Sequence, residues 1–165
     1  MKMSRQWIGV TLLIAVMHAL WAYTVLPDRV ASHWDGAGVP NGYMDRIGFI
    51  SFYLWLMVGM TAVFSGIGVL IRHTPNDAIN LPNREYWLSP ERREATLSRI
   101  TESLSAFVLL LNVFMIAVHH LSILANLTVE KQLSNVIWVL LLMFLSGTGL
   151  WVWRLQQDFK IPTQS

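Results

Sequence analysis

The chain has 165 residues, of which 54% are hydrophobic and only 13% are charged. Soluble globular domains carry about a quarter charged residues, so this composition indicates a membrane protein. The absence of cysteine excludes disulfides, thiolate metal sites and a cysteine nucleophile. The net charge of +2 says little about partners, and the sequence has no excess of basic residues suited to nucleic acid. The apolar residues fall into four blocks, each long enough to cross a bilayer as a helix. We therefore predict an all-α membrane protein, a four-transmembrane-helix bundle that forms a single membrane domain over residues 1–165.

The first apolar block covers residues 7–26 and contains no Asp, Glu, Lys or Arg. It is longer than the apolar part of a typical secretory signal, and no convincing cleavage site follows it, so we interpret it as a membrane helix. Pro27 directly after it favours a helix end. His18 lies near the middle of this span, where a polar side chain is expected to face the interior of the bundle.

Residues 27–48 form a polar, turn-rich connection. Asp35-Gly36-Ala37-Gly38 and Pro40-Asn41-Gly42 are turn signals, because glycine accepts positive φ and proline fixes φ. The pattern predicts a small β-hairpin or compact loop, with Trp34 and Tyr43 as packing partners or interfacial anchors. Two interpretations stay open, a structural cap between two helices and a recognition surface. The candidate recognition residues are His33, Trp34, Asp35, Gly38, Pro40, Asn41 and Tyr43.

The order of residues in this connection resembles the signature loop of a family of small bacterial membrane proteins of unknown function. That loop is shared with the SdpI-like immunity proteins, which protect a cell against a secreted toxic peptide. The shared points are Leu26-Pro27, His33-Trp34-Asp35, Gly38, Pro40-Asn41-Gly42 and Tyr43. A second patch with the same likeness covers residues 80–88. The resemblance implies a bacterial cytoplasmic (inner) membrane protein whose loop meets a peptide or another envelope partner.

The second span is predicted at residues 49–71 and the third at residues 104–127, joined by a connection at residues 72–103 that mixes arginines with acids. In this connection Ser89-Pro90-Glu91 is a strong helix start, so we expect a helix that begins near Pro90 and continues into the third span. The connection could be a docking site or only a solvated, charged segment. The candidate docking residues are Asn83, Arg84, Tyr86, Trp87, Arg92 and Arg93.

The fourth span is predicted at residues 136–153, and the basic residues then set the orientation, since Lys and Arg are retained on the cytoplasmic side. One side would hold nine of them: Lys2, Arg5, Arg72, Arg84, Arg92, Arg93, Arg99, Arg154 and Lys160. The other side would hold three: Arg29, Arg46 and Lys131. We therefore expect both termini and the 72–103 loop in the cytoplasm and the 27–48 loop outside.

Histidines and carboxylates from separate elements could converge near the outer face, and both are ligands for zinc and similar ions. The weak candidates for a metal site are His18, His33, Asp35, His119 and His120. None of them has a recognised metal-ligand spacing, and adjacent His119 and His120 should point about 100° apart on a helix. The alternative is a structural role for His18 in hydrogen bonding between helices. We expect no cofactor.

Three functions remain open at this point. The first is a non-enzymatic binding or immunity-type membrane protein that uses its outer loop for peptide-toxin immunity or envelope sensing. The second is an accessory subunit that packs against a larger membrane complex. The third is a metal-dependent membrane enzyme, although the sequence has no nucleophile elbow and no metalloprotease motif. The expected partners are the lipid bilayer, a peptide or membrane protein and a second copy of the chain, but not nucleic acid.

Overall fold

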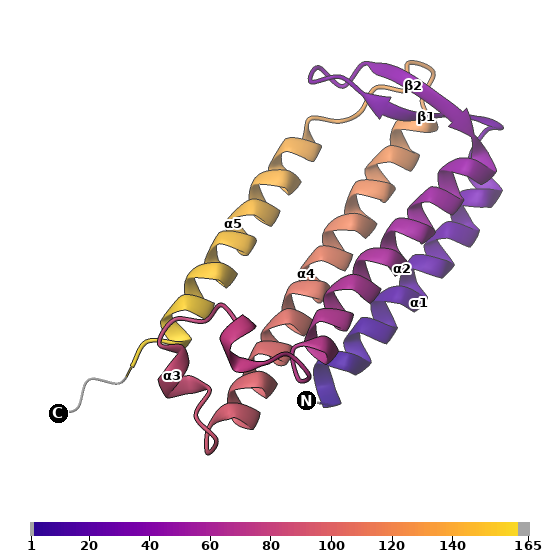
Figure 1. Ribbon diagram of the computed structural model, residues 1–165. Coiled ribbons are helices and arrows are strands. Elements are labelled where there is room, and N and C mark those ends of the chain that lie inside the picture. The colour runs from indigo at the N-terminus through magenta and orange to yellow at the C-terminus, as the bar shows by residue number, and fades with distance from the viewer. Residues whose placement is uncertain (1, 162–165) are drawn as a thin grey trace.

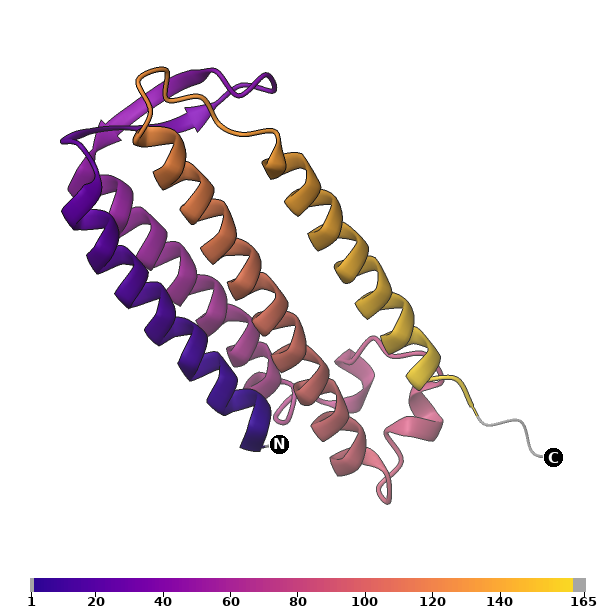
Figure 2. The same cartoon turned by 180° about the vertical axis from the view of Figure 1, so that it is seen from behind.

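The computed structural model consists of four long helices lying side by side, with a two-stranded hairpin across one end (Figure 1, Figure 2). It describes residues 2–161, with side chains from Gln6 onward. The long helices are α1 (Lys2–Val25), α2 (Arg46–Leu70), α4 (Arg93–Asn126) and α5 (Val136–Asp158). All four have the length and the apolar composition needed to cross a membrane. The predicted four-helix architecture with a hairpin between the first two helices is confirmed.

The helix ends differ from the predicted ends for local reasons. Helix α4 begins at Arg93 rather than near Pro90, and it follows a turn in which the backbone N–H groups of Arg92 and Arg93 both donate to the carbonyl of Ser89. Helix α5 runs to Asp158 rather than residue 153. Its last turn is held in place by the following residue, Phe159, which is fully buried.

Arg46 joins the end of α1 to the start of α2. Its guanidinium donates to the carbonyl oxygen of Leu26 at 3.0 Å, where the helix has ended before Pro27, and pairs with Asp28 at 3.0 Å. The neighbouring Asp45 is the N-cap of α2, and its carboxylate accepts from the backbone N–H of Gly48 at 2.7 Å. These bonds satisfy backbone groups that a helix end leaves unpaired, and they fix where the hairpin leaves and re-enters the bundle.

The hairpin consists of β1 (Arg29–Trp34) and β2 (Pro40–Asp45), which pair antiparallel. Arg29 lies opposite Asp45, and the register shifts on either side of His33. Such shifts bend and twist a strand pair. One face of β1 packs onto the bundle through Val30, which belongs to a buried cluster with Ala22, Leu26, Phe49 and Ile123.

Helices α1, α2 and α4 pack against one another, whereas α5 packs against α4 and contains no buried residue. Alanines on α1, among them Ala15 and Ala19, let the neighbouring backbones approach closely. In the middle of the bundle the fully buried Asn112 donates to Thr11 at 3.0 Å and accepts from Thr61 at 3.1 Å. This amide therefore ties α4 to both α1 and α2.

The opposite end of the bundle carries the connection between α2 and α4, with the short elements η1 (Asn76–Ala78) and α3 (Arg84–Trp87). A small apolar cluster of Ile79, Leu88 and Leu97 anchors it. Figure 1 shows that this connection, the start of α1 and the end of α5 lie at one end of the molecule, away from the hairpin. We call the two ends the hairpin end and the loop end.

Candidate functional site

At the hairpin end, two of the predicted recognition residues, Trp34 and Gly38, hold the hairpin onto the connection between α4 and α5, and a third, Asp35, closes the hairpin turn. The indole N–H of Trp34 donates to the carbonyl of Lys131 at 2.8 Å. The carboxylate of Asp35 accepts from the backbone N–H groups of Ala37 and Val39 and closes the turn. Gly38 has a φ of +79°, and its carbonyl accepts from the N–H of Leu133 at 2.9 Å. These contacts support the structural interpretation for Trp34, Asp35 and Gly38.

Asn126, the last residue of α4, was not among the predicted residues, yet it attaches the hairpin to that helix. Its buried side-chain amide accepts from the N–H of Ala31 at 2.7 Å and donates to the carbonyl of Ala31 at 2.9 Å. The amide thus pairs with the edge of β1 as a neighbouring strand would. The only sequence signal for this role is an asparagine at the end of an apolar span.

The other predicted recognition residues lie on or beside the outward side of the hairpin. His33 and Asn41 are exposed and hydrogen-bonded to each other, and Pro40 pairs with Trp34 at the start of β2. Tyr43 is also exposed, and its ring lies 4.8 Å from the guanidinium of Arg29 and 5.8 Å from the ammonium of Lys131. Trp34 and Tyr43 have separate partners rather than packing on each other. We define the outward hairpin face as Arg29, His33, Asn41, Tyr43 and Lys131.

On α1 and α4 near this end, three histidines form a hydrogen-bonded chain. Nε2 of His18 lies 3.2 Å from Nδ1 of His120, and Nδ1 of His18 lies 3.1 Å from Nδ1 of His119. The 100° separation expected for the adjacent His119 and His120 would let at most one of them easily face a given site. In the structure both contact His18, because the His18 ring meets one of them with each of its two nitrogens. The chain runs from exposed His120 to buried His119.

The metal candidates do not come together as one site. His33 and Asp35 belong to the hairpin, where they bond to Asn41 and to the turn backbone. Among the residues that the structure describes, no group of three or more His, Cys, Asp or Glu side chains is arranged to hold a metal ion. The ring nitrogens of the histidine chain that face each other are already used in pairs, which matches the interhelix hydrogen-bonding role considered for His18.

Tyr53 of α2 is a residue that the sequence analysis missed. Its ring lies flat on the imidazole of His119, with the ring centroids 3.6 Å apart and the planes inclined by 3°. Phe49 stacks on the same imidazole at 5.2 Å. The hydroxyl of Tyr53 and Nε2 of His119 are buried without a hydrogen-bond partner. A tyrosine in an apolar span looks like one more aromatic packing residue, so its pattern carries no signal for this pair.

Tyr53 and His119 both line a groove of about 480 Å³ between α2, α4 and α5, which we call the interhelix groove. Its other walls are mainly apolar and include Phe52, Leu56, Phe114, Met115, Ile137 and Leu141. A second hollow of about 390 Å³ lies under the hairpin turn and shares Ser32 and Ser122 with the first. The two hollows therefore adjoin, from the underside of the hairpin to the rings of Tyr53 and His119.

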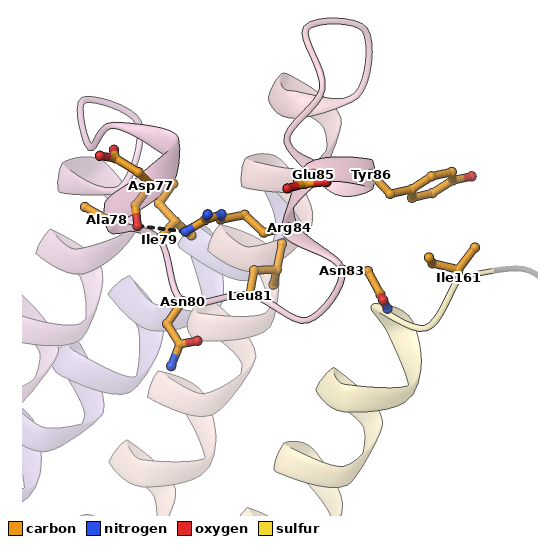
Figure 3. Close-up of a pocket in the computed structure, with 10 residues that line it drawn as sticks. All are labelled: Asp77, Ala78, Ile79, Asn80, Leu81, Asn83, Arg84, Glu85, Tyr86 and Ile161. Atoms are coloured by element: carbon orange, nitrogen blue, oxygen red, sulfur yellow. Dashed lines mark hydrogen bonds between the residues drawn. The ribbon is translucent and has the colours of Figure 1, made fainter.

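At the loop end, a more open hollow of about 650 Å³ lies among residues 77–86 and Ile161, and it includes three of the predicted docking residues, Asn83, Arg84 and Tyr86 (Figure 3). Arg84 donates across it to the carbonyl of Asp77 at 2.9 Å. Asn83 has a φ of +51°, and its side chain donates to the carbonyl of Phe159 at 3.0 Å. The rim of this hollow is therefore tied to the end of α5.

The remaining predicted docking residues stabilise this connection from within. The indole of Trp87 also donates to the carbonyl of Phe159, at 2.9 Å. Arg93 donates to Asn76 and to the carbonyls of Arg72 and Thr74. The guanidinium of Arg92 lies over the Tyr86 ring at 4.2 Å.

Glu91 lies in the turn just before α4. Hydrogen bonds from its own backbone N–H and from the Ser89 hydroxyl lower the pKa of its exposed carboxyl group below the usual value. Glu91 belongs to the turn that precedes α4, because α4 begins at Arg93 with Arg92 as its N-cap and Glu94 as the acid of its first turn.

Comparison with known proteins gives one family match. Residues 10–57 match a domain of unknown function (DUF1648). The matched part covers less than a third of the chain and includes most of α1, the hairpin and the first half of α2. No curated protein and no solved structure matches the chain. The match is consistent with a small uncharacterised family of membrane proteins.

Proposed function

We propose that this chain is a non-enzymatic protein of the bacterial cytoplasmic membrane that receives a peptide or another envelope ligand on its outward hairpin face. The observation that carries the proposal is that this face is exposed on a rigid support. Trp34, Gly38 and Asn126 fix the hairpin to the bundle, while His33, Asn41 and Tyr43 remain accessible. Preorganised surfaces lose little conformational entropy when they bind a ligand.

The orientation belongs to this proposal. The described basic side chains at the loop end are Arg72, Arg84, Arg92, Arg93, Arg99, Arg154 and Lys160, against Arg29, Arg46 and Lys131 at the hairpin end. The side chains of Lys2 and Arg5, which the prediction also counted, lie outside the described part of the structure. This asymmetry favours a cytoplasmic loop end and an outward hairpin, where a secreted peptide would arrive.

The resemblance to the loop of SdpI-like proteins favours peptide-toxin immunity or envelope sensing as the role of this protein. The chemistry of the face fits a peptide, because an aromatic ring beside two cations can contact acidic and aromatic side chains together. The DUF1648 match includes the hairpin, but its description assigns no activity.

Deletion of the gene followed by challenge with membrane-active peptides tests the proposal. We expect the deletion strain to be more sensitive to at least one peptide, and we expect Tyr43→Ala to fail to restore resistance. Val129→Ser is the matched control, because Val129 is 94% exposed at the same end and lies outside the outward hairpin face. Unchanged sensitivity of the deletion strain across the panel would contradict the proposal.

A second candidate function is that of an accessory subunit, and the packing of α5 favours it. This helix buries none of its described residues, and large side chains such as Trp138, Leu142 and Trp153 are exposed along it. Purification in a gentle detergent, followed by native mass spectrometry, distinguishes the accessory-subunit role from the ligand-binding role. A larger complex with other membrane proteins would support the subunit role, whereas a monomer or homodimer would count against it.

A further inference from the structure

We propose that the interhelix groove is a binding site for a bilayer-soluble molecule with a planar, oxygen-bearing ring and an apolar tail, the chemistry of an isoprenoid quinone. This site is distinct from the outward hairpin face, so the two proposals stand or fall separately. The inference starts from two of the three side-chain polar atoms that the described part of the fold buries without a partner, the hydroxyl of Tyr53 and Nε2 of His119.

Both side chains are only 5% exposed, and each has one unpaired polar atom. Leaving such an atom unpaired in an apolar interior is costly, and native proteins rarely do so without a functional reason. The two atoms belong to rings that stack on each other 3.6 Å apart and line the same groove. A single ligand oxygen could therefore accept from the tyrosine O–H and from a protonated Nε2 together.

The histidine chain fixes which atom of His119 is available. Since Nδ1 of His119 faces Nδ1 of His18, Nε2 lies on the other side of the ring and has no partner. When each ring of the chain passes one hydrogen to the next, from His120 to His18 to His119, Nε2 of His119 carries the remaining hydrogen and becomes a donor. In the opposite tautomer it becomes an acceptor. A ligand oxygen selects the first arrangement, so binding would set the tautomers of all three histidines.

The lining identifies the rest of the ligand. Phe49, Phe52 and Phe114 offer flat aromatic surfaces for a planar ring, and Met44, Met60 and Met115 are flexible side chains that can move aside as it enters. The movement is needed because the two unpaired atoms are shielded from solvent. A volume of about 480 Å³ falls in the range of small-molecule sites.

The route of entry also favours a lipid-soluble occupant. The groove opens between helices that are long and apolar enough to cross a membrane, and its α5 wall belongs to a helix with no buried residue. A water-soluble peptide would have to bury unpaired backbone groups there, which is expensive. A molecule that is already dissolved in the bilayer has no such cost.

The test is a titration of the full chain, in nanodiscs of defined phospholipid, with a benzoquinone carrying a ten-carbon chain. We expect saturable binding by calorimetry, together with a change in the side-chain ¹⁵N shifts of His119, His18 and His120. Tyr53→Phe keeps the ring and removes the hydroxyl, so we expect about tenfold weaker binding with an unchanged or raised unfolding temperature. A purely packing role for Tyr53 would leave the affinity unchanged.

Tyr23→Phe is the matched control, because Tyr23 is exposed on α1 and does not line the interhelix groove, so loss of its hydroxyl should leave quinone binding unchanged. His119→Phe supplies a second variant with weaker binding, and its histidine spectrum would show the chain interrupted. The proposal is overturned if the quinone does not saturate the protein or if Tyr53→Phe binds as tightly as the wild type. Equally tight binding of the same alkyl chain without its ring would overturn it in favour of a phospholipid acyl chain.

Discussion

Gly38 sets the position of the hairpin turn through a conformation and a contact that only glycine allows. Its φ is +79°, and a Cβ atom there would lie 2.5 Å from the carbonyl oxygen of Leu133. We expect Gly38→Ala to destabilise the protein by about 1–3 kcal/mol and to detach the turn from the connection between α4 and α5. Thermal unfolding in detergent measures the loss.

Gly36 in the same turn provides the control, since nothing lies within 4 Å of a Cβ built on it and its φ is not positive. Gly36→Ala should be neutral or stabilising by up to about 1 kcal/mol. Equal destabilisation by both substitutions would mean that the turn is sensitive to any side chain, and the argument from Gly38 would fail.

The buried amide of Asn112 supports a second prediction for a single residue. Asn112→Ala removes the partner of both Thr11 and Thr61, so three helices lose a shared contact. Hydrogen bonds between membrane helices contribute modestly, and we expect a loss of about 1 kcal/mol in the free energy of unfolding in bicelles. The adjacent Val113, which is 58% exposed, gives the control Val113→Ala. A loss no larger than that of the control would show that the amide contributes nothing specific.

Single residues were harder to predict from the sequence than the elements that carry them. The sequence indicated that His18 would face the bundle, and the structure places it between two other histidines. It could not indicate the partnership of Tyr53 with His119, because contacts between separate helices depend on their relative rotation and depth. For the same reason the predicted recognition residues could not be divided into those that hold the hairpin, such as Trp34, and those that stay exposed, such as Tyr43.

Among the elements, the hairpin depends on α4 more than on its own two strands. A two-stranded hairpin is marginal in isolation, and Asn126 supplies the partner that the edge of β1 lacks. We expect Asn126→Ala to leave the helices intact while hydrogen exchange at the amide of Ala31 accelerates. Asn135→Ala is the matched control, because the Asn135 side chain makes no capping bond to α5. Unaltered protection of Ala31 in Asn126→Ala would refute the docking role.

The elements themselves were largely predictable, because uncharged runs of about 20 residues have few alternatives to membrane helices. Pro27 and the apolar run from residue 49 placed the end of α1 and the start of α2 to within a few residues. The end of α5 could not be predicted in this way. Its last turn is stabilised by Phe159, whose burial depends on Trp87 and Asn83 from a distant part of the chain.

At the scale of the whole molecule, the two ends have different kinds of chemistry. The loop end gathers most of the arginines, and these are tied into the connection by bonds such as those of Arg93 and Arg84 to backbone carbonyls. The hairpin end leaves an exposed, mixed polar face above an apolar groove. A molecule built this way can respond to a ligand at one end only if that end faces the compartment from which the ligand comes, so the orientation decides between functions.

The absence of cysteine from the sequence makes this orientation directly measurable. A single cysteine at Val129, which is 94% exposed at the hairpin end, should react with a membrane-impermeant maleimide added to intact spheroplasts. A single cysteine at Glu85, exposed at the loop end, should react only after permeabilisation. The physical reason for this expected orientation is the excess of arginine at the loop end, because basic segments are retained in the cytoplasm.

The unmodified chain is the blank. Labelling of Glu85→Cys but not Val129→Cys in intact spheroplasts would show that the orientation is the opposite one. The outward hairpin face would then lie in the cytoplasm, where a secreted peptide could not reach it.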